Sequence, residues 1–407
     1  MPGIKIILLI GFLSLAACDI PDRNTLHHAY GSLEFNPAKT DAKMPEAPVP
    51  LPDGLETLIH EAEQINQVFK VERFLKLECK DASVIAQIDS VVYLDECWFI
   101  LDSLQKKVLK FDDKGRFVQQ ISRVGEGPGE FRYPTHMKRV GDLIAVGDPN
   151  HSAVLLFDGH GNHIRSLSTF PHKIFLQHAF ILTDQYRLYT AYPRSGRADA
   201  PFHAVFDFAK DPGTVLYGFG ERFALLEKKI ITGATRKRLT AFEKIGDRIW
   251  TGSPYGSHLD IFDLEGRFLG KLPSGLDGLQ YSDFEKINFR NRKERYKLYG
   301  KLSNGAIHQV GPLVVVSLEH QGGSLFNLYD QAGNLLKKGL ERSDCYRKIH
   351  LGFKDQIIGS FPVDIEYVAY YQKYLTKEEF RNLENAGWDP NNFSDDNPYL
   401  VIGKSTF

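Results

Sequence analysis

The stretch FDDKGRFVQQI, residues 111–121, contains a hairpin that recurs through this chain. An aromatic residue and an aspartate end one strand, two residues and a glycine make the turn, and alternating apolar residues begin the next strand. Glycine suits this turn because the tight reversal requires a positive φ. The same design recurs in FDGHGNHIRSL (157–167), FDLEGRFLGKL (262–272) and YDQAGNLLKKGL (329–340), with a degenerate copy in AVFDFAKDPGTVLYG (204–218).

A further strand precedes these hairpins at a regular distance. The clearest candidates are CWFILD (97–102), LIAVGD (143–148), RIWTGS (248–253) and LVVVSL (313–318). Nine residues separate Asp102 from Phe111, and the same spacing separates Asp148 from Phe157. Another short strand lies upstream of each, so every unit holds four strands at a period of about 46 residues. This arrangement indicates a β-propeller, because a β-sandwich would not repeat one hairpin in register.

The units that follow this pattern span 83–121, 134–167, 176–218, 238–272 and 305–340, and a last one starts near Tyr346. A helical pattern interrupts the last unit at about 364–387, where Thr376 and Glu379 form a capping box. The strand NPYLVIGKS (397–405) then returns, and VERFLKLE (71–78) is left without a partner, so we expect the two to pair and close the ring. The predicted fold is all-β, a six-bladed β-propeller of four-stranded antiparallel blades with a small helical insertion in the last blade.

The N-terminal residues predict export and a lipid anchor. Residues 1–17 hold one lysine, an apolar run and a pair of small residues, which is the pattern of a signal peptide. The alternative is a transmembrane anchor, but the run is shorter than the roughly 18 to 20 residues that span a bilayer. Leu15–Cys18 resembles the bacterial lipobox, in which Cys18 would carry the lipid. We expect anchoring to the bacterial cell envelope, with the outer membrane preferred and its periplasmic or surface face left open.

A polar segment with several prolines follows the anchor. Its composition buries too little apolar area to fold alone, so we interpret residues 18–66 as the lipidated cysteine and a flexible tether. Near its end, LETLIHEAEQI (55–65) spaces apolar residues along one helical face, which predicts a short docking helix. The propeller itself would cover residues 67–407.

The composition limits the possible partners. With 50 basic and 51 acidic residues the chain has no global field that would attract nucleic acid. Cys79, Cys97 and Cys345 allow at most one disulfide, and whether they form one stays open. We expect a monomeric propeller that contacts the membrane through its lipid and recognises an envelope protein or a glycan locally.

Three stretches carry a resemblance to a known family. They are LECKDASVIAQIDSVVYL, FDDKGRFVQQISRVGEGPGEF and the terminal DDNPYLVIGK. Together they resemble the six-bladed β-propeller lipoproteins of Gram-negative bacteria, relatives of the NHL and TolB-like propellers. The resemblance covers about residues 68–407 and implies the fold and the envelope location. It implies no reaction.

The loop RVGEGPGEF (123–131) raises the question of a phosphate site. A dinucleotide loop would need G-x-G-x-x-G before a helix, and a P-loop would need a Gly-Lys-Ser or Gly-Lys-Thr ending, and neither is present. We therefore interpret the loop as the corner that leads from one blade to the next. The alternative is that Glu126 or Glu130 contacts a cation or a sugar at the mouth of the channel.

Histidines are the candidate ligands in the central channel. His136 and His178 occupy equivalent places, each six residues before an aspartate, and His308 lies about two residues from the same register. They could converge on one divalent cation or on an anionic ligand. The alternative is that they are polar side chains of a wet channel. No G-x-S-x-G motif and no traceable lactonase ligand set is present.

The segment 281–301 interleaves cations with aromatic side chains. Such a mixture can stack on sugars and pair with carboxylates, although a solvated insertion is the alternative. The candidate binding face consists of Arg290, Arg292, Arg295, Tyr296 and Tyr299. The sequence thus predicts a lipid-anchored, non-enzymatic binding module for a glycan, peptide or partner protein, with no cofactor required. The alternative is a metal-dependent hydrolase or lactonase that uses a divalent cation in the channel.

Overall fold

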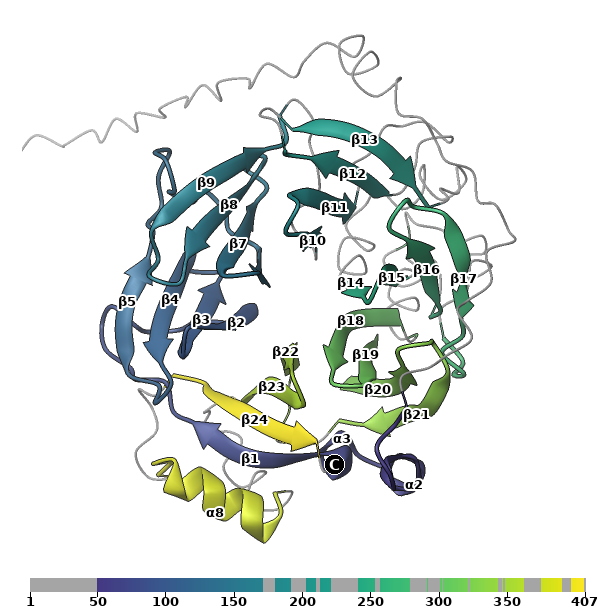
Figure 1. The fold of residues 1–407 in the computed structure, drawn as a ribbon. Helices are drawn as coiled ribbons and strands as arrows, with labels where there is room; N and C mark the ends of the chain where they lie inside the picture. The colour runs from purple at the N-terminus through teal and green to yellow at the C-terminus, as the bar shows by residue number, and fades with distance from the viewer. Residues whose placement is uncertain are drawn as a thin grey trace, which may run out of the picture. The chain divides into compact units, whose positions relative to one another are not determined.

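The computed structural model places its described residues in six four-stranded sheets arranged as a ring (Figure 1). It describes residues 50–170, 180–191, 203–209, 213–220, 241–252, 257–278, 291, 301, 303–320, 323–342, 346, 348–361, 375–389 and 397–405. Each sheet is antiparallel throughout. The predicted six-bladed propeller is confirmed.

Five blades follow the chain directly, and their strands run from the channel outward in chain order. Blade 1 holds β2 (Ser90–Leu94), β3 (Cys97–Asp102), β4 (Lys107–Asp112) and β5 (Phe117–Ile121). Blade 2 holds β6 (His136–Val140), β7 (Leu143–Asp148), β8 (Ala153–Asp158) and β9 (His163–Ser168). Blade 3 holds β10 (Phe180–Leu182), β11 (Arg187–Ala191), β12 (His203–Asp207) and β13 (Thr214–Phe219).

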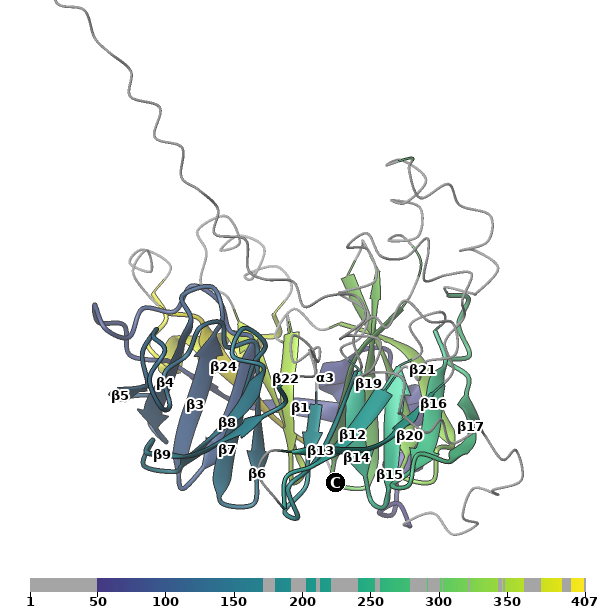
Figure 2. The ribbon, with the colours of Figure 1, turned by 90° about the horizontal axis from the view of Figure 1, so that it is seen from above.

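Blades 4 and 5 repeat the same order. Blade 4 holds β14 (Phe242–Ile245), β15 (Arg248–Gly252), β16 (Leu259–Asp263) and β17 (Phe268–Leu272). Blade 5 holds β18 (Ser303–Val310), β19 (Leu313–His320), β20 (Gly323–Asp330) and β21 (Leu335–Glu341). Figure 2, turned by 90°, shows the strands running between the two faces of the ring. The innermost strands β2, β6, β10, β14, β18 and β22 surround the channel.

Blade 6 closes the ring by joining the two ends of the folded chain. It holds β22 (Lys348–Phe353), β23 (Gln356–Phe361), β24 (Tyr399–Ser405) and, outermost, β1 (Phe69–Leu75). Strand β1 pairs with β24 from Phe69 opposite Ser405 to Leu75 opposite Leu400. The predicted pairing of residues 71–78 with residues 397–405 is confirmed, and it satisfies two strand edges at once.

In the recurring hairpin, one aspartate accepts the hydrogen bonds that organise the turn. In four copies the carboxylate Oδ1 accepts a hydrogen bond at 2.8 Å from the backbone N–H four residues later, in Asp112, Asp158, Asp263 and Asp330. Oδ2 accepts from the side chain of that same fourth residue, which is arginine or asparagine. The aspartate thus organises the turn that the glycine makes possible.

The aromatic residue before each aspartate packs between neighbouring blades. Phe111, Phe157, Phe262 and Tyr329 are at most 4% exposed. Each packs in an apolar cluster shared by neighbouring sheets. The Phe157 ring, for example, lies 5.5 Å from that of Phe131, which precedes β6, the first strand of the same blade. The two residues of the signature therefore have separate tasks, one in packing and one in the turn.

Among the described residues, three helices pack against blades 5 and 6, with α2 (Leu55–Glu61) next to β21 and with α3 (Ile65–Val68) and α8 (Lys377–Asn385) next to β1. Helix α2 buries Leu55 and Ile59, and α3 leads into β1, so ordered packing begins before residue 67. The predicted docking helix is confirmed. Helix α8, whose first turn has the predicted capping box, confirms the helical insertion and lies along the outer strand β1 (Figure 1). Within the described part of the chain, no helix has the length and apolar character to cross a bilayer.

Candidate functional site

The central channel contains a cavity of about 470 Å³. Its wall comes from the inner strands of blades 1, 2, 4, 5 and 6. The polar and aromatic residues of the wall are Tyr93, His136, Lys138, Arg139, Phe242, Glu243, Lys244, His308, Gln309, His350 and Phe353. Aromatic surface with a few polar groups is the usual lining of a small-ligand site.

One level of this wall is built by equivalent residues of the inner strands. The residue before the last of each strand is Tyr93 in β2, Arg139 in β6, Lys244 in β14, Gln309 in β18 and Gly352 in β22. All five line the cavity. A Cβ on Gly352 would lie 2.2 Å from the carbonyl oxygen of Gln309, so glycine is required where β18 and β22 approach. We call these residues the mouth ring, because one residue separates each of them from a two-residue turn.

An ion pair crosses the channel beneath the mouth ring. Lys138 Nζ of β6 lies 2.6 Å from Glu243 Oε2 of β14, although blade 3 stands between their blades. The inner strand of blade 3 is the three-residue β10, whose apolar side chains are buried. Both charged side chains are about four-fifths buried, so the pair is shielded from water and salt better than a surface pair. It forms the floor of the mouth ring.

Two neutral imidazoles lie beside this floor. Burial, together with the positive charges of Lys138 and Lys348, lowers the pKa of His308 to about 4. Burial and the charge of Lys348 also lower the pKa of His350 well below its usual range. At neutral pH neither ring adds charge to the channel, so its positive charge resides on lysine and arginine.

The predicted channel histidines occupy different levels. His136 begins β6, where its Nδ1 lies 3.4 Å from Ser90 Oγ and its ring meets Phe180 edge-on at 5.5 Å. Counting back from the hairpin turns, Ala306 of β18 matches His136, and His308 lies two residues further along. Both histidines line the cavity. His178 lies outside the described residues.

The described residues contain no group of three His, Cys, Asp or Glu side chains placed to hold a metal ion. The described residues therefore offer no ligand set for the predicted divalent cation. Because His178, one of the predicted ligands, lies outside the described residues, the cation site stays a prediction. His350 resembles a catalytic base in one respect, since its Nε2 lies 2.8 Å from Ser360 Oγ. Its buried Nδ1 has no hydrogen-bond partner among the described residues, so no carboxylate orients the ring as in a hydrolase triad.

The sequence reasoning missed Lys138, Glu243 and His350. Counting back two residues from the end of each inner strand finds Lys138, Glu243 and His308 together, and this signal was available in the repeat. His350 was harder to place, because the register shift of β22 lies between Ile349 and Leu351, at His350 itself.

The loop 123–131 is an internally bonded corner between β5 and β6. The N–H of Phe131 donates to the Arg123 carbonyl oxygen at 2.9 Å, and the Gly125 N–H donates to the Phe131 carbonyl oxygen at 2.9 Å. Gly129 has a φ of 77°, and a Cβ there would lie 2.6 Å from that of His163. These contacts support the structural interpretation of the loop.

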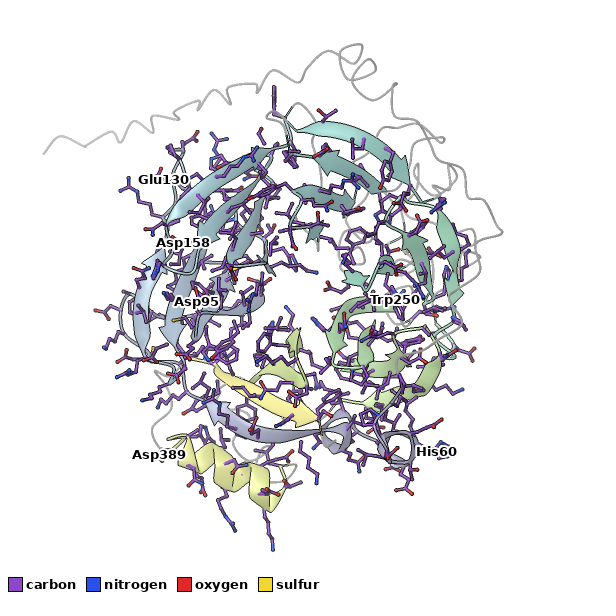
Figure 3. All side chains as sticks on the ribbon, viewed as in Figure 1. His60, Asp95, Glu130, Asp158, Trp250 and Asp389 are labelled. Atoms are coloured by element: carbon purple, nitrogen blue, oxygen red, sulfur yellow. The ribbon has the colours of Figure 1, made fainter. Side chains whose placement is uncertain are left out.

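The two glutamates of this loop bond within it. The Gly127 N–H donates to Glu130 at 2.8 Å and Arg123 lies 2.5 Å from it, and both interactions lower the pKa of Glu130. Glu126 pairs with Arg132. Glu130 lies at the outer rim of the ring (Figure 3), and neither glutamate lines the channel cavity. The loop starts at an outermost strand, which explains why its acidic residues stay away from the channel.

A second cavity of about 370 Å³ lies between blades 1 and 6 and shares Tyr93 and Phe353 with the first. Their rings lie 5.6 Å apart, and the Tyr93 ring also lies 4.4 Å from that of Trp98. The other lining residues are Glu72, Arg73, Gln356 and Ile402. We call this cavity the side groove. The five residues of the predicted binding face, Arg290, Arg292, Arg295, Tyr296 and Tyr299, lie outside the described residues, as does the predicted lipidation site Cys18.

Comparisons with known proteins agree with this architecture. A crystal structure of a Bacteroides fragilis protein described as exported is similar at a TM-score of 0.60 and 15% identity, over 84% of this chain and 97% of that one. A member of the DUF4221 family from Bacteroides vulgatus has a TM-score of 0.48 at 13% identity, over 83% and 97% of the two chains. A search of curated proteins found no match. The family model DUF5128, described as a six-bladed β-propeller, matches residues 57–268, which is half of the chain, so the chain belongs to this family of six-bladed β-propellers.

Proposed function

We propose that this protein is a lipid-anchored binding module of the bacterial envelope, which holds a glycan, peptide or partner protein at its central channel without catalysing a reaction. The observation that carries the proposal is the channel cavity, whose aromatic and charged side chains come from five blades. Such a rigid wall fixes ligand-contacting groups on strands, and little ordering is needed when a ligand enters.

The alternative hydrolase gains no support from the described channel. Lys138 and Glu243 neutralise each other, and the hydroxyl nearest to a channel histidine, that of Ser360, does not line the cavity. A binding site needs no nucleophile, and the paired charges and aromatic rings suit it as they stand.

Export and lipidation are supported by the N-terminal sequence. The apolar run ends in Leu15-Ala16-Ala17-Cys18. The similar Bacteroides fragilis protein is described as exported, which agrees with this part of the proposal. Replacing Cys18 with serine should abolish incorporation of labelled fatty acid and release the protein from membrane fractions. Unchanged labelling of the variant would contradict the anchor.

The ligand site is tested by filling the channel. Ala306 lines the cavity with a small side chain, so Ala306→Phe should obstruct it without removing a polar group. We expect the full-length protein in detergent to bind members of a glycan array, and Ala306→Phe to lose that binding while keeping the wild-type melting temperature. Val118→Phe, an exposed position on the outer strand β5, is the matched control. Equal binding by Ala306→Phe and wild type would exclude the channel.

The basic segment outside the described residues is a second contact proposed from the sequence. Replacing Arg290, Arg292 and Arg295 together with alanine should weaken binding of an acidic ligand and leave stability unchanged. Tyr296 and Tyr299 belong to the same segment. If the triple variant binds the ligand as tightly as wild type, this segment is excluded as a ligand contact.

A further inference from the structure

We propose that the mouth ring binds a uronic acid residue of a glycan, with Arg139 and Lys244 pairing with the sugar carboxylate. This inference rests on the proposed function, since it names the ligand class of that same site. Tyr93 would pack on the sugar ring, and Gln309 would hydrogen-bond its hydroxyls.

The net positive charge of the cavity wall favours an anionic ligand. Among the described lining residues, Lys138, Arg139 and Lys244 are cationic and Glu243 is the one carboxylate, so the wall has three positive charges and one negative charge. The carboxylate is already held by Lys138 at 2.6 Å. Two positive charges therefore remain at the mouth, where a carboxylate would compensate them.

The arginine is held ready for such a contact. Arg139 Nε donates to the Gly141 carbonyl oxygen at 2.8 Å and Nη1 donates to the Tyr93 carbonyl oxygen at 3.4 Å. Its described acidic neighbour is Asp142, at 3.8 Å and 96% exposed, which is a weak ion pair. Lys244 is exposed and has no ion pair with any described residue. Because Arg139 and Lys244 both line the channel cavity, a carboxylate that enters it can pair with either cation.

The aromatic residues favour a sugar over a smaller acid. Tyr93 and Phe353 are partly exposed and border both the channel cavity and the side groove. The apolar C–H face of a pyranose packs on such rings, while amides such as Gln309 meet its hydroxyls. The channel cavity of about 470 Å³ has room for one sugar unit, and the groove of about 370 Å³ could hold the next.

The test uses full-length protein in detergent and three probes of similar size. Isothermal titration compares trigalacturonate with its neutral counterpart galactotriose and with the peptide triglutamate. The comparison shows whether binding requires the carboxylate, the sugar or both. We expect trigalacturonate to bind at least tenfold more tightly than either, and to weaken as salt rises. Each of Arg139→Gln and Lys244→Gln should lower its affinity by roughly tenfold, the usual effect of losing one charged hydrogen bond. Lys271→Gln, an exposed cation on the outer strand β17, should have no effect.

A pair of floor variants sharpens the test. Glu243→Gln removes the negative charge under the mouth and should strengthen trigalacturonate binding, whereas Lys138→Met leaves Glu243 unpaired and should weaken it. A purely structural role would make both variants weaker. Equal binding of the three probes, or tighter binding of triglutamate or galactotriose, would overturn the inference. If array glycans are lost in Ala306→Phe but kept in Arg139→Gln and Lys244→Gln, the channel binds and the uronate inference fails; if Ala306→Phe changes nothing, the proposed function fails.

Discussion

At the residue scale, a few buried polar groups decide the character of the channel. His308 stays neutral because burial and the charges of Lys138 and Lys348 oppose its protonation. The unfolded chain takes up a proton below about pH 6.5, while the folded chain does so only near pH 4. Between these values the unfolded state binds more protons, so this group makes the protein less stable as the pH falls.

The first prediction follows from this linkage. His308→Gln should lose less stability than wild type between pH 6.5 and pH 4, by up to about 3 kcal/mol. Urea unfolding at a series of pH values measures the difference. His60→Gln, on the exposed side of α2, serves as the control and should follow the wild-type curve. Parallel curves for His308→Gln and wild type would show that the histidine is not excluded from protonation in the folded state.

At the element scale, the hairpin depends on one of two adjacent aspartates. Asp112 accepts hydrogen bonds from the backbone N–H groups of Lys114 and Arg116 and from the Arg116 side chain, whereas Asp113 is exposed in the same turn. Asp112→Ala should destabilise the protein by about 1 to 2 kcal/mol, because it leaves these donors without their acceptor. Asp113→Ala should stay within about 0.5 kcal/mol. Chemical denaturation compares them, and equal losses would refute the assigned role.

At the scale of the whole molecule, strand β24 closes the ring. It lies between β1 and β23, and six of its seven residues are buried. Deleting residues 397–407 would leave β1 without a strand partner and open the ring, so we expect loss of the cooperative thermal transition and rapid proteolysis. Thr376→Ala, which removes only the cap of α8, should cost about 1 kcal/mol and keep the transition. A truncated protein with an unchanged melting temperature would contradict this role.

Local chemistry explains how much could be predicted from the sequence. The aspartate, the turn glycine and the donor four residues later are neighbours in the chain, so the hairpin signature and its period predicted the blades. The strand that closes the ring was predictable as well, because residues 71–78 and 397–405 were the segments left without partners. The capping box of α8 is likewise a pattern within four residues.

Only the tertiary structure decided what meets in the channel. Lys138 and Glu243 are 105 residues apart, and they touch because the intervening blade has a three-residue inner strand. The register shift of β22 lies between Ile349 and Leu351, and it places His350 off the periodic positions. The sequence determined the blades because turn and strand preferences act between neighbours, whereas the channel contacts depend on the lengths and registers of several strands at once.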